Sequence, residues 1–119
     1  MSDGYSGQHF FGEIDELNDE LDKAVGEMRD AGRKKAQTEH DYRVALAKKM
    51  WELRACGTPA TGMGDLARGD DVVAMRKLER DAAESEYWAS QEAINVMKIR
   101  VRTVSEQIGR DWGRPNSSY

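Results

Sequence analysis

The side chains that could carry out chemistry are few and lie far apart in this sequence. The two histidines, His9 and His40, are not part of a Glu-x-x-His arrangement, which helical bundles use to hold two iron ions. Cys56, the single cysteine, has no cysteine or histidine neighbour at a zinc-ligand spacing. His40 lies about four helical turns before Cys56, too far for a Cys–His nucleophile pair. We therefore expect no metal, no cofactor and no catalytic residue, and so a protein that is not an enzyme.

The segment 57–70 is rich in glycine, which raises the question of phosphate binding. Its glycines do not form a Gly-x-x-x-x-Gly-Lys-Ser/Thr loop, and they do not follow a predicted strand. We interpret them as turn residues.

Basic side chains on both sides of this segment offer a second kind of site. Nucleic acid could be contacted by Lys48, Lys49, Arg54, Arg68, Arg76 and Arg80. Trp51, in the same region, could stack on a base. Acidic residues nearby, such as Asp65 and Asp70, reduce the positive electrostatic potential of this region. Nucleic-acid binding is therefore the alternative, and a solvated surface is the favoured interpretation.

The aromatic side chains favour a protein partner. Tyr87 and Trp88 are adjacent, so in a helix they point about 100° apart and only one can enter a narrow seam. An exposed aromatic side chain is a typical interface anchor. The residues that we expect to contact a partner are Trp51, Pro59, Asp65, Arg68, Tyr87 and Trp88.

Two long helices must position these residues. The sequence predicts helices over 13–56 and 71–112 joined by the linker 57–70, an all-α antiparallel hairpin that resembles a coiled coil. Gly57 has the place of a helix C′ glycine, and Asp70 or Asp71 would cap the second helix. Residues 12–113 then form one domain, with flexible tails over 1–11 and 114–119.

Heptad-like stripes predict which faces are buried. The first helix has its stripe at Ile14, Leu17, Leu21, Ala24, Met28, Ala31, Lys35, Thr38, Tyr42, Ala45, Lys49, Glu52 and Cys56. Glycine at position 32 disfavours the helix by about 1 kcal/mol relative to alanine, so a break of the helix at Gly32 remains an alternative. In the second helix we expect inward-facing side chains at Val72, Met75, Leu78 and Ala82, followed by small residues at Ser85, Ala89 and Ala93.

The C-terminal half of the second helix carries a wider apolar arc. It consists of Ile94, Val96, Met97, Ile99, Val101, Val104, Ile108 and Trp112. One neighbouring helix cannot cover such an arc, so we expect its members other than Trp112 to form an oligomer interface in which two hairpins make a four-helix bundle. The alternative is that residues 5–11 fold back over the arc.

Charge favours the antiparallel arrangement. Residues 13–22 contain six acidic side chains, whereas Lys98, Arg100, Arg102 and Arg110 lie near the end of the second helix. An antiparallel hairpin brings these two ends together.

The composition fits a protein built from exposed helices. Of the 119 residues 34% are charged, and the net charge is −4. No apolar run approaches the roughly 20 residues of a membrane span, and the N-terminal residues lack the pattern of a signal peptide. We expect a cytoplasmic protein that does not enter a membrane.

Several strings around the linker resemble those of a known family. They are Tyr42-Arg43-x-Ala45-Leu46, Glu52-Leu53-Arg54-x-x-Gly57-Thr58-Pro59-Ala60-Thr61, Asp65-Leu66-Ala67-Arg68-Gly69-Asp70, Glu92-Ala93-Ile94-Asn95 and Arg110-Asp111-Trp112. The family consists of small helical proteins encoded by tailed phages and prophages of Gram-positive bacteria. The resemblance implies an origin among early, DNA-metabolism genes, and it supplies no catalytic residues.

Together these patterns predict a non-enzymatic phage or prophage accessory protein. It would bind and modulate a phage or host complex of recombination, replication or defence, from a bacterial cytoplasm. The alternatives are a nucleic-acid-binding factor that uses the basic tip, and a virion or scaffold component.

Overall fold

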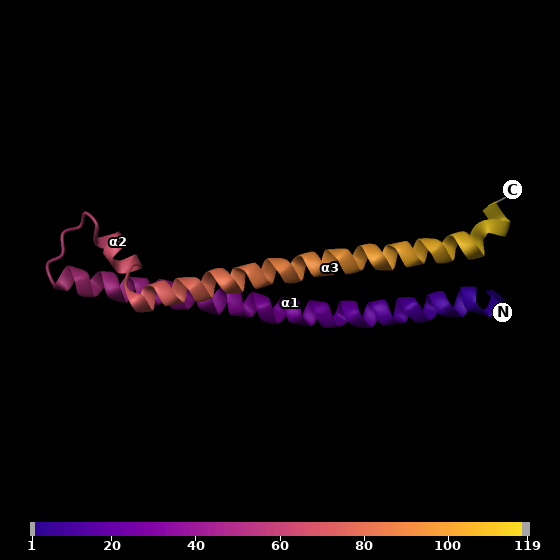
Figure 1. Cartoon of the computed structure of the whole chain (residues 1–119), viewed down its shortest axis with the longest axis horizontal. Coiled ribbons are helices and arrows are strands. Elements are labelled where there is room, and N and C mark those ends of the chain that lie inside the picture. The colour runs from indigo at the N-terminus through magenta and orange to yellow at the C-terminus, as the bar shows by residue number, and fades with distance from the viewer. Residues whose placement is uncertain (1, 118–119) are drawn as a thin grey trace. The chain divides into compact units, whose positions relative to one another are not determined.

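Three helices account for the secondary structure that the computed structural model describes. It describes the backbone of residues 2–117 and the side chains of residue 9 and residues 11–111. The helices are α1 (Ser2–Ala55), α2 (Met63–Arg68) and α3 (Asp71–Ser117) (Figure 1). Within these residues there is no strand, so the prediction of an all-α chain is confirmed.

The two long helices extend beyond their predicted ends. The sequence predicts flexible tails over 1–11 and 114–119, whereas α1 already begins at Ser2 and α3 continues to Ser117. Residues 5–11 are helical within α1, so they do not fold back over the apolar arc. Residues 1, 118 and 119, and the side chain of Trp112, lie outside the described part.

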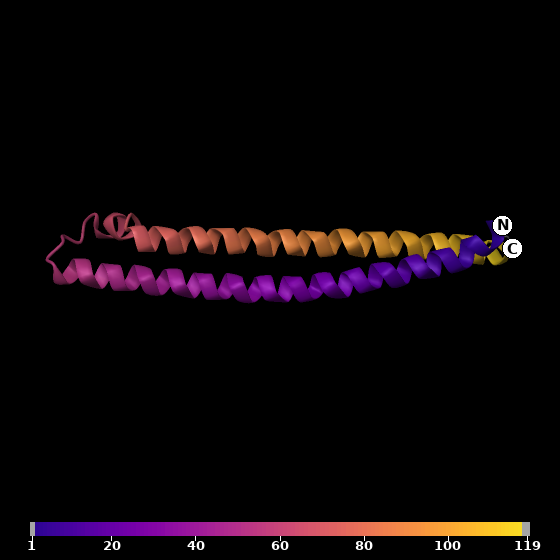
Figure 2. The same ribbon diagram turned by 60° about the horizontal axis from the view of Figure 1, so that its bottom comes forward.

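The chain divides into two compact units, which are described separately. We call Arg29–Ala89 the tip unit, because it contains the linker. The terminal unit consists of Met1–Met28 and Ser90–Tyr119. In each unit a segment of α1 lies beside an antiparallel segment of α3 (Figures 1 and 2).

In the tip unit, capping motifs define the end of α1 and the start of α3. Gly57 has a positive φ of 80°, and the N–H groups of Gly57 and Thr58 donate to the carbonyls of Arg54 and Leu53 at 3.0 Å. This pair of bonds is a Schellman motif with Gly57 at C′, as predicted. Asp70 caps α3, because its carboxylate accepts hydrogen bonds from the N–H groups of Val72 and Val73.

The helix α2 attaches the linker to the unit by one face. Met63 is 5% exposed and Ala67 is fully buried, whereas Leu66 of the same helix is 58% exposed.

In α1 the predicted stripe faces inward as far as Lys49, whereas its last two members, Glu52 and Cys56, are exposed. Ala24 and Tyr42 are buried, and the helix continues through Gly32 without a break. Gly32 is needed because a Cβ there would lie 3.3 Å from Cε1 of Tyr87. The glycine therefore gives the Tyr87 ring room to pack against α1.

In the first half of α3 the predicted inward face is wrong by one residue. Val73 and Ala83 are each 1% exposed and form the actual inward face. The side chains predicted to face inward are exposed, namely Val72, Met75, Leu78, Ala82, Ser85, Ala89 and Ala93. Arg80 and Tyr87, which meet α1 at Glu39 and Gly32, lie on the same face as Val73 and Ala83, and this face packs inward instead.

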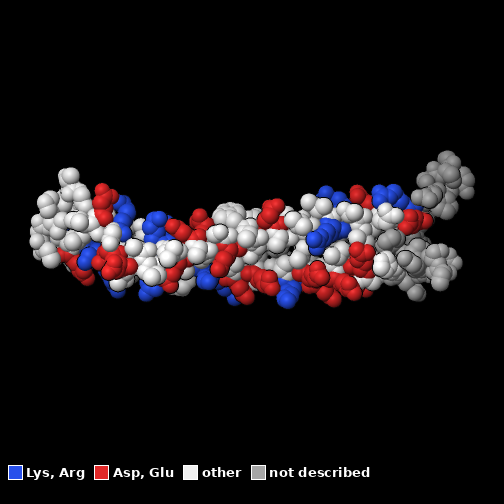
Figure 3. All heavy atoms as spheres, in the orientation of Figure 1, with Lys and Arg blue, Asp and Glu red and all other residues white. Residues whose placement is uncertain are grey.

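The terminal unit has a more apolar seam. Ile94 is 5% exposed, and the half-buried side chains behind it are Ile14, Leu17, Leu21, Met97, Val101, Val104 and Ile108. Acidic side chains gather along α1 in this unit, and basic ones lie on α3 (Figure 3). This is the charge arrangement that the sequence predicts for an antiparallel pair.

Candidate protein-binding surface

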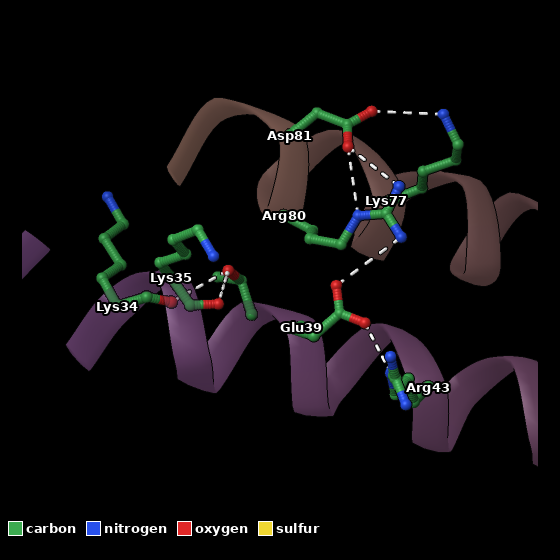
Figure 4. A network of polar contacts seen from close by, with 8 residues as sticks. Lys34, Lys35, Glu39, Arg43, Lys77, Arg80 and Asp81 are labelled. Atoms are coloured by element: carbon green, nitrogen blue, oxygen red, sulfur yellow. Dashed lines mark hydrogen bonds and ion pairs between the residues drawn. The ribbon is translucent and has the colours of Figure 1, made fainter. Parts of the chain in front are cut away.

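A polar layer in the tip unit holds α1 and α3 together. Arg80 of α3 donates from Nε and Nη2 to Asp81 at 3.1 and 3.0 Å, and its Nη1 lies 3.7 Å from Glu39 of α1 (Figure 4). Glu39 also accepts a 2.6 Å hydrogen bond from Arg43. The guanidinium carbon of Arg80 lies 4.4 Å from the centroid of the Tyr42 ring. The layer therefore combines ion pairs with a cation–π contact and specifies how the two helix segments align.

The carboxyl groups of this layer are held in their charged form. Hydrogen bonds from Arg80 and then Lys77 lower the pKa of Asp81, and the hydrogen bond from Arg43 lowers the pKa of Glu39. A general acid or base needs a pKa near the working pH. These two groups are shifted away from it, so the layer is suited to positioning helices.

A groove opens beside this layer, near the linker. Its volume is about 420 Å³, and its lining includes Val44 and Lys48 from α1 and Val72, Val73 and Arg76 from α3. The walls are thus partly apolar and partly charged.

The groove brings together three of the six basic residues predicted to contact nucleic acid. Lys48, Lys49 and Arg76 line it, but so do Asp41, Glu52 and Asp70. Nζ of Lys49 lies 3.3 Å from Asp70 and 3.6 Å from Glu52.

The other three basic residues do not join this group. Arg80 belongs to the polar layer, Arg54 is exposed at the end of α1, and Arg68 lies 3.4 Å from Asp65 on α2. The basic tip expected from the sequence is therefore a surface of mixed charge.

The aromatic side chains differ in exposure as the sequence predicts. Tyr87 is half-buried against Gly32, whereas its neighbour Trp88 is 54% exposed, with the two ring centroids 5.3 Å apart. Trp51 is more exposed than Trp88, at 69%. An indole this exposed has an apolar surface in water that a partner could cover.

The remaining predicted contact residues lie on the linker and α2. Pro59, Asp65 and Arg68 are all exposed. The sequence patterns do not predict the exposure of Leu66 on the same helix or of Val44 on α1. Helical spacing offers no signal for Leu66, because it lies three residues after the buried Met63 and residues at that spacing share one side of a helix.

The lone thiol sits near the same end of the tip unit. Cys56 is free and exposed, directly after the last residue of α1.

The described residues contain no group of three His, Cys, Asp or Glu side chains able to hold a metal ion. None of the described helices combines the length and the apolar character of a membrane span. Comparison of the chain with models of protein families, with curated proteins and with solved structures finds no match.

Proposed function

We propose that this chain is a non-enzymatic accessory protein of a tailed phage or prophage, and that it acts in the bacterial cytoplasm by binding another protein through its tip unit. The partner would belong to a phage or host complex of recombination, replication or defence.

The exposure of Trp51 is the observation that carries the proposal. A tryptophan that is 69% exposed buries much apolar area when a partner covers it, and tryptophan is enriched among the residues that dominate binding energy. Leu66 and Val72, exposed at 58% and 59%, add apolar side chains to the same unit. The polar layer supports these positions by fixing the alignment of α1 and α3, so little order needs to be gained on binding.

The test is affinity capture from phage-producing cells, with and without nuclease. Wild-type protein should retain one stoichiometric protein that survives nuclease, and Trp51→Ala with Leu66→Ser should lose it. The matched control is Val25→Ser, which changes an exposed apolar residue of α1 in the terminal unit and should retain the partner. Equal capture by all three proteins would count against the tip unit as the binding surface.

Nucleic-acid binding is the second candidate, because Lys48, Lys49 and Arg76 line one groove. It predicts that affinity for an oligonucleotide falls steeply as salt is raised, since bound phosphates release counterions. The replacement Lys48→Glu with Arg76→Glu should remove that binding. Recovery of DNA-associated proteins that vanish on nuclease treatment would favour this candidate over the first.

Self-association completes the proposal: two chains pair into a four-helix bundle. It is supported by apolar side chains of α3 that remain open in the terminal unit, where Val96 is 42% and Ile99 is 57% exposed. Of the other members of the predicted interface, Ile94 is buried within the unit, and Met97, Val101, Val104 and Ile108 are half-buried.

A further inference from the structure

The groove near the linker lies wholly within the tip unit and has both apolar and charged walls. Its apolar lining comes from Val44 and Ala45 of α1 and from Val72 and Val73 of α3. Val44 is 38% and Val72 is 59% exposed, so each helix presents apolar surface to water here. The charged lining consists of three acidic and three basic residues, namely Asp41, Glu52, Asp70, Lys48, Lys49 and Arg76.

The acidic residues of the groove have partners in their own chain. Nζ of Lys49 lies 3.3 Å from Asp70 and 3.6 Å from Glu52. Asp41 accepts a 2.9 Å hydrogen bond from Gln37. A cationic ligand would have to compete with these contacts, so the acidic lining does not favour one.

The basic residues of the groove differ from one another. Lys49 is held by the two acids just named, and Arg76 lies 3.0 Å from Glu79 on the next turn of α3. The ammonium group of Lys48 makes no ion pair or hydrogen bond with any residue that the structure describes. Lys48 is exposed one turn after Val44. The groove therefore has an unbalanced positive charge beside apolar surface.

Lys48 belongs to a line of exposed residues that leads from the groove to Trp51. Val44, Lys48 and Trp51 follow one another at steps of four and three residues, so they share one face of α1. Trp51 comes two turns after Val44, about 10 Å along the helix axis. The line presents an aliphatic side chain, a cation and an indole ring, in that order.

We propose that this line and the adjoining groove bind an amphipathic helix of the partner protein that carries one carboxylate between two apolar side chains. The inference rests on the proposed function and specifies the kind of segment that the tip unit recognises. One apolar side chain packs between Val44 and Val72, and the other packs on Trp51. The carboxylate pairs with Lys48. Anchors at such steps of three, four and seven residues are typical of helices that bind in grooves.

A helix with a carboxylate fits this groove better than a nucleic-acid strand does. A strand places successive phosphates beside several cations, whereas Lys49 and Arg76 are already paired with acids. Its phosphates would also meet the carboxylates of Asp41 and Asp70. A single carboxylate needs a single free cation, and the apolar side chains beside it need apolar walls.

The test uses the full chain and two synthetic peptides of about 15 residues in an alanine-rich helical sequence. Both peptides have two leucines seven residues apart, and the residue between them is glutamate in one and lysine in the other. Wild-type protein should bind the glutamate peptide about fivefold more tightly, as judged by the anisotropy of labelled peptide. The largest amide shifts of the protein should fall around Val44, Lys48 and Val72. Equal affinities, or no binding of either peptide at millimolar concentration, would overturn the proposal.

A charge reversal makes the test specific to one side chain. Lys48→Glu should reverse the preference, so that the lysine peptide binds more tightly than the glutamate peptide. Lys23→Glu is the matched control, because it changes the net charge equally at an exposed residue of α1 in the terminal unit, and it should keep the wild-type preference. A Lys48→Glu protein that still prefers the glutamate peptide would contradict the assignment of Lys48.

The apolar wall has a separate test. Val72→Ser should lower the affinity for both peptides by about fivefold and leave their ratio unchanged, because it removes apolar contact and no charge. Met75→Ser is the control, since Met75 is 55% exposed on the same helix but does not line the groove. Unchanged affinity in the Val72→Ser protein would rule out the groove as the place where the helix binds.

A single-stranded oligonucleotide in the same titration represents the other class of partner. It should bind more weakly than the glutamate peptide. Tighter binding of the oligonucleotide, lost in Lys48→Glu and falling steeply with salt, would overturn the peptide assignment in favour of nucleic acid.

These results are separable from the test of the proposed function. If Lys48→Glu retains the captured protein that Trp51→Ala with Leu66→Ser loses, the tip unit binds its partner without the groove, and only the present inference fails. If the peptide preference reverses as expected but Trp51→Ala with Leu66→Ser captures as much as wild type, the groove stands and the anchors of the proposed function fail.

Discussion

The guanidinium group of Arg80 lies over the ring of Tyr42, with 4.4 Å between its central carbon and the ring centroid. Tyr42 is 7% exposed, so this contact is largely shielded from water. Glu39 and Asp81 flank this half-buried arginine and balance its positive charge. Such a layer gains less from burial than an aliphatic one.

A double-mutant cycle at these two residues should reveal their coupling. We expect Arg80→Met and Tyr42→Leu to be non-additive by about 0.5–1 kcal/mol in urea unfolding, because each change removes the same cation–π contact. Arg43→Met with Tyr42→Leu serves as the control, since the Arg43 side chain is 77% exposed. Effects that add within about 0.3 kcal/mol in the first cycle would contradict a stabilising contact.

Two glycines of α1 should respond differently to replacement by alanine. A Cβ at Gly26 would meet nothing within 4 Å, so Gly26→Ala should raise the free energy of unfolding by about 1 kcal/mol through helix propensity. At Gly32 the added Cβ would lie 3.3 Å from Cε1 of Tyr87, which offsets that gain. Equal stabilisation by both changes, measured by urea midpoint at one protein concentration, would show that Tyr87 does not need the space.

The turn after α1 depends on left-handed backbone geometry. Gly57 has φ of 80°, a conformation that costs an ordinary L-residue about 1–2 kcal/mol. Thermal unfolding should therefore rank the proteins as wild type, then Gly57→Asn, then Gly57→Ala, because asparagine tolerates this region better than alanine. An alanine variant as stable as the asparagine variant would argue against the Schellman turn.

Stability should fall in acid, and Asp70 should contribute to the fall. The N–H of Val73, and then Lys49, lower the pKa of Asp70 below its unfolded value near 3.9. Its stabilising effect is therefore complete above about pH 4 and is lost as the pH falls through the lower pKa of the folded state. Asp70→Asn should reduce the acid dependence of the urea midpoint while keeping a capping oxygen. Asp71→Asn is the control, because its carboxyl group is not the cap, and it should keep the dependence.

Local signals predict much of this fold. The seam of α1 follows its heptad stripe through Tyr42, and both helix ends at the linker follow from residues with known conformational preferences, Gly57 and Asp70. These features depend on a few neighbouring residues, so periodicity and capping chemistry are enough to find them.

The inward face of α3 in the tip unit could not be predicted in the same way. Apolar periodicity selects Val72, Met75 and Leu78, but the helix turns Val73 and Arg80 inward instead. That choice depends on the polar partners that α1 offers, and they become visible only when the two helices are paired. The same rotation leaves Met75 and Leu78 exposed in the tip unit.

Cys56 provides a labelling site for a fluorophore in the natural sequence. It is the single cysteine of the chain, it is exposed, and it follows the last residue of α1. One fluorophore attached there, without any substitution, would mark every molecule at the same place next to the linker. Its rotational freedom would sense a ligand that covers the tip unit, whereas energy transfer between two labelled copies would sense pairing through α3. A single reactive atom can therefore read out both proposed contacts in one sample.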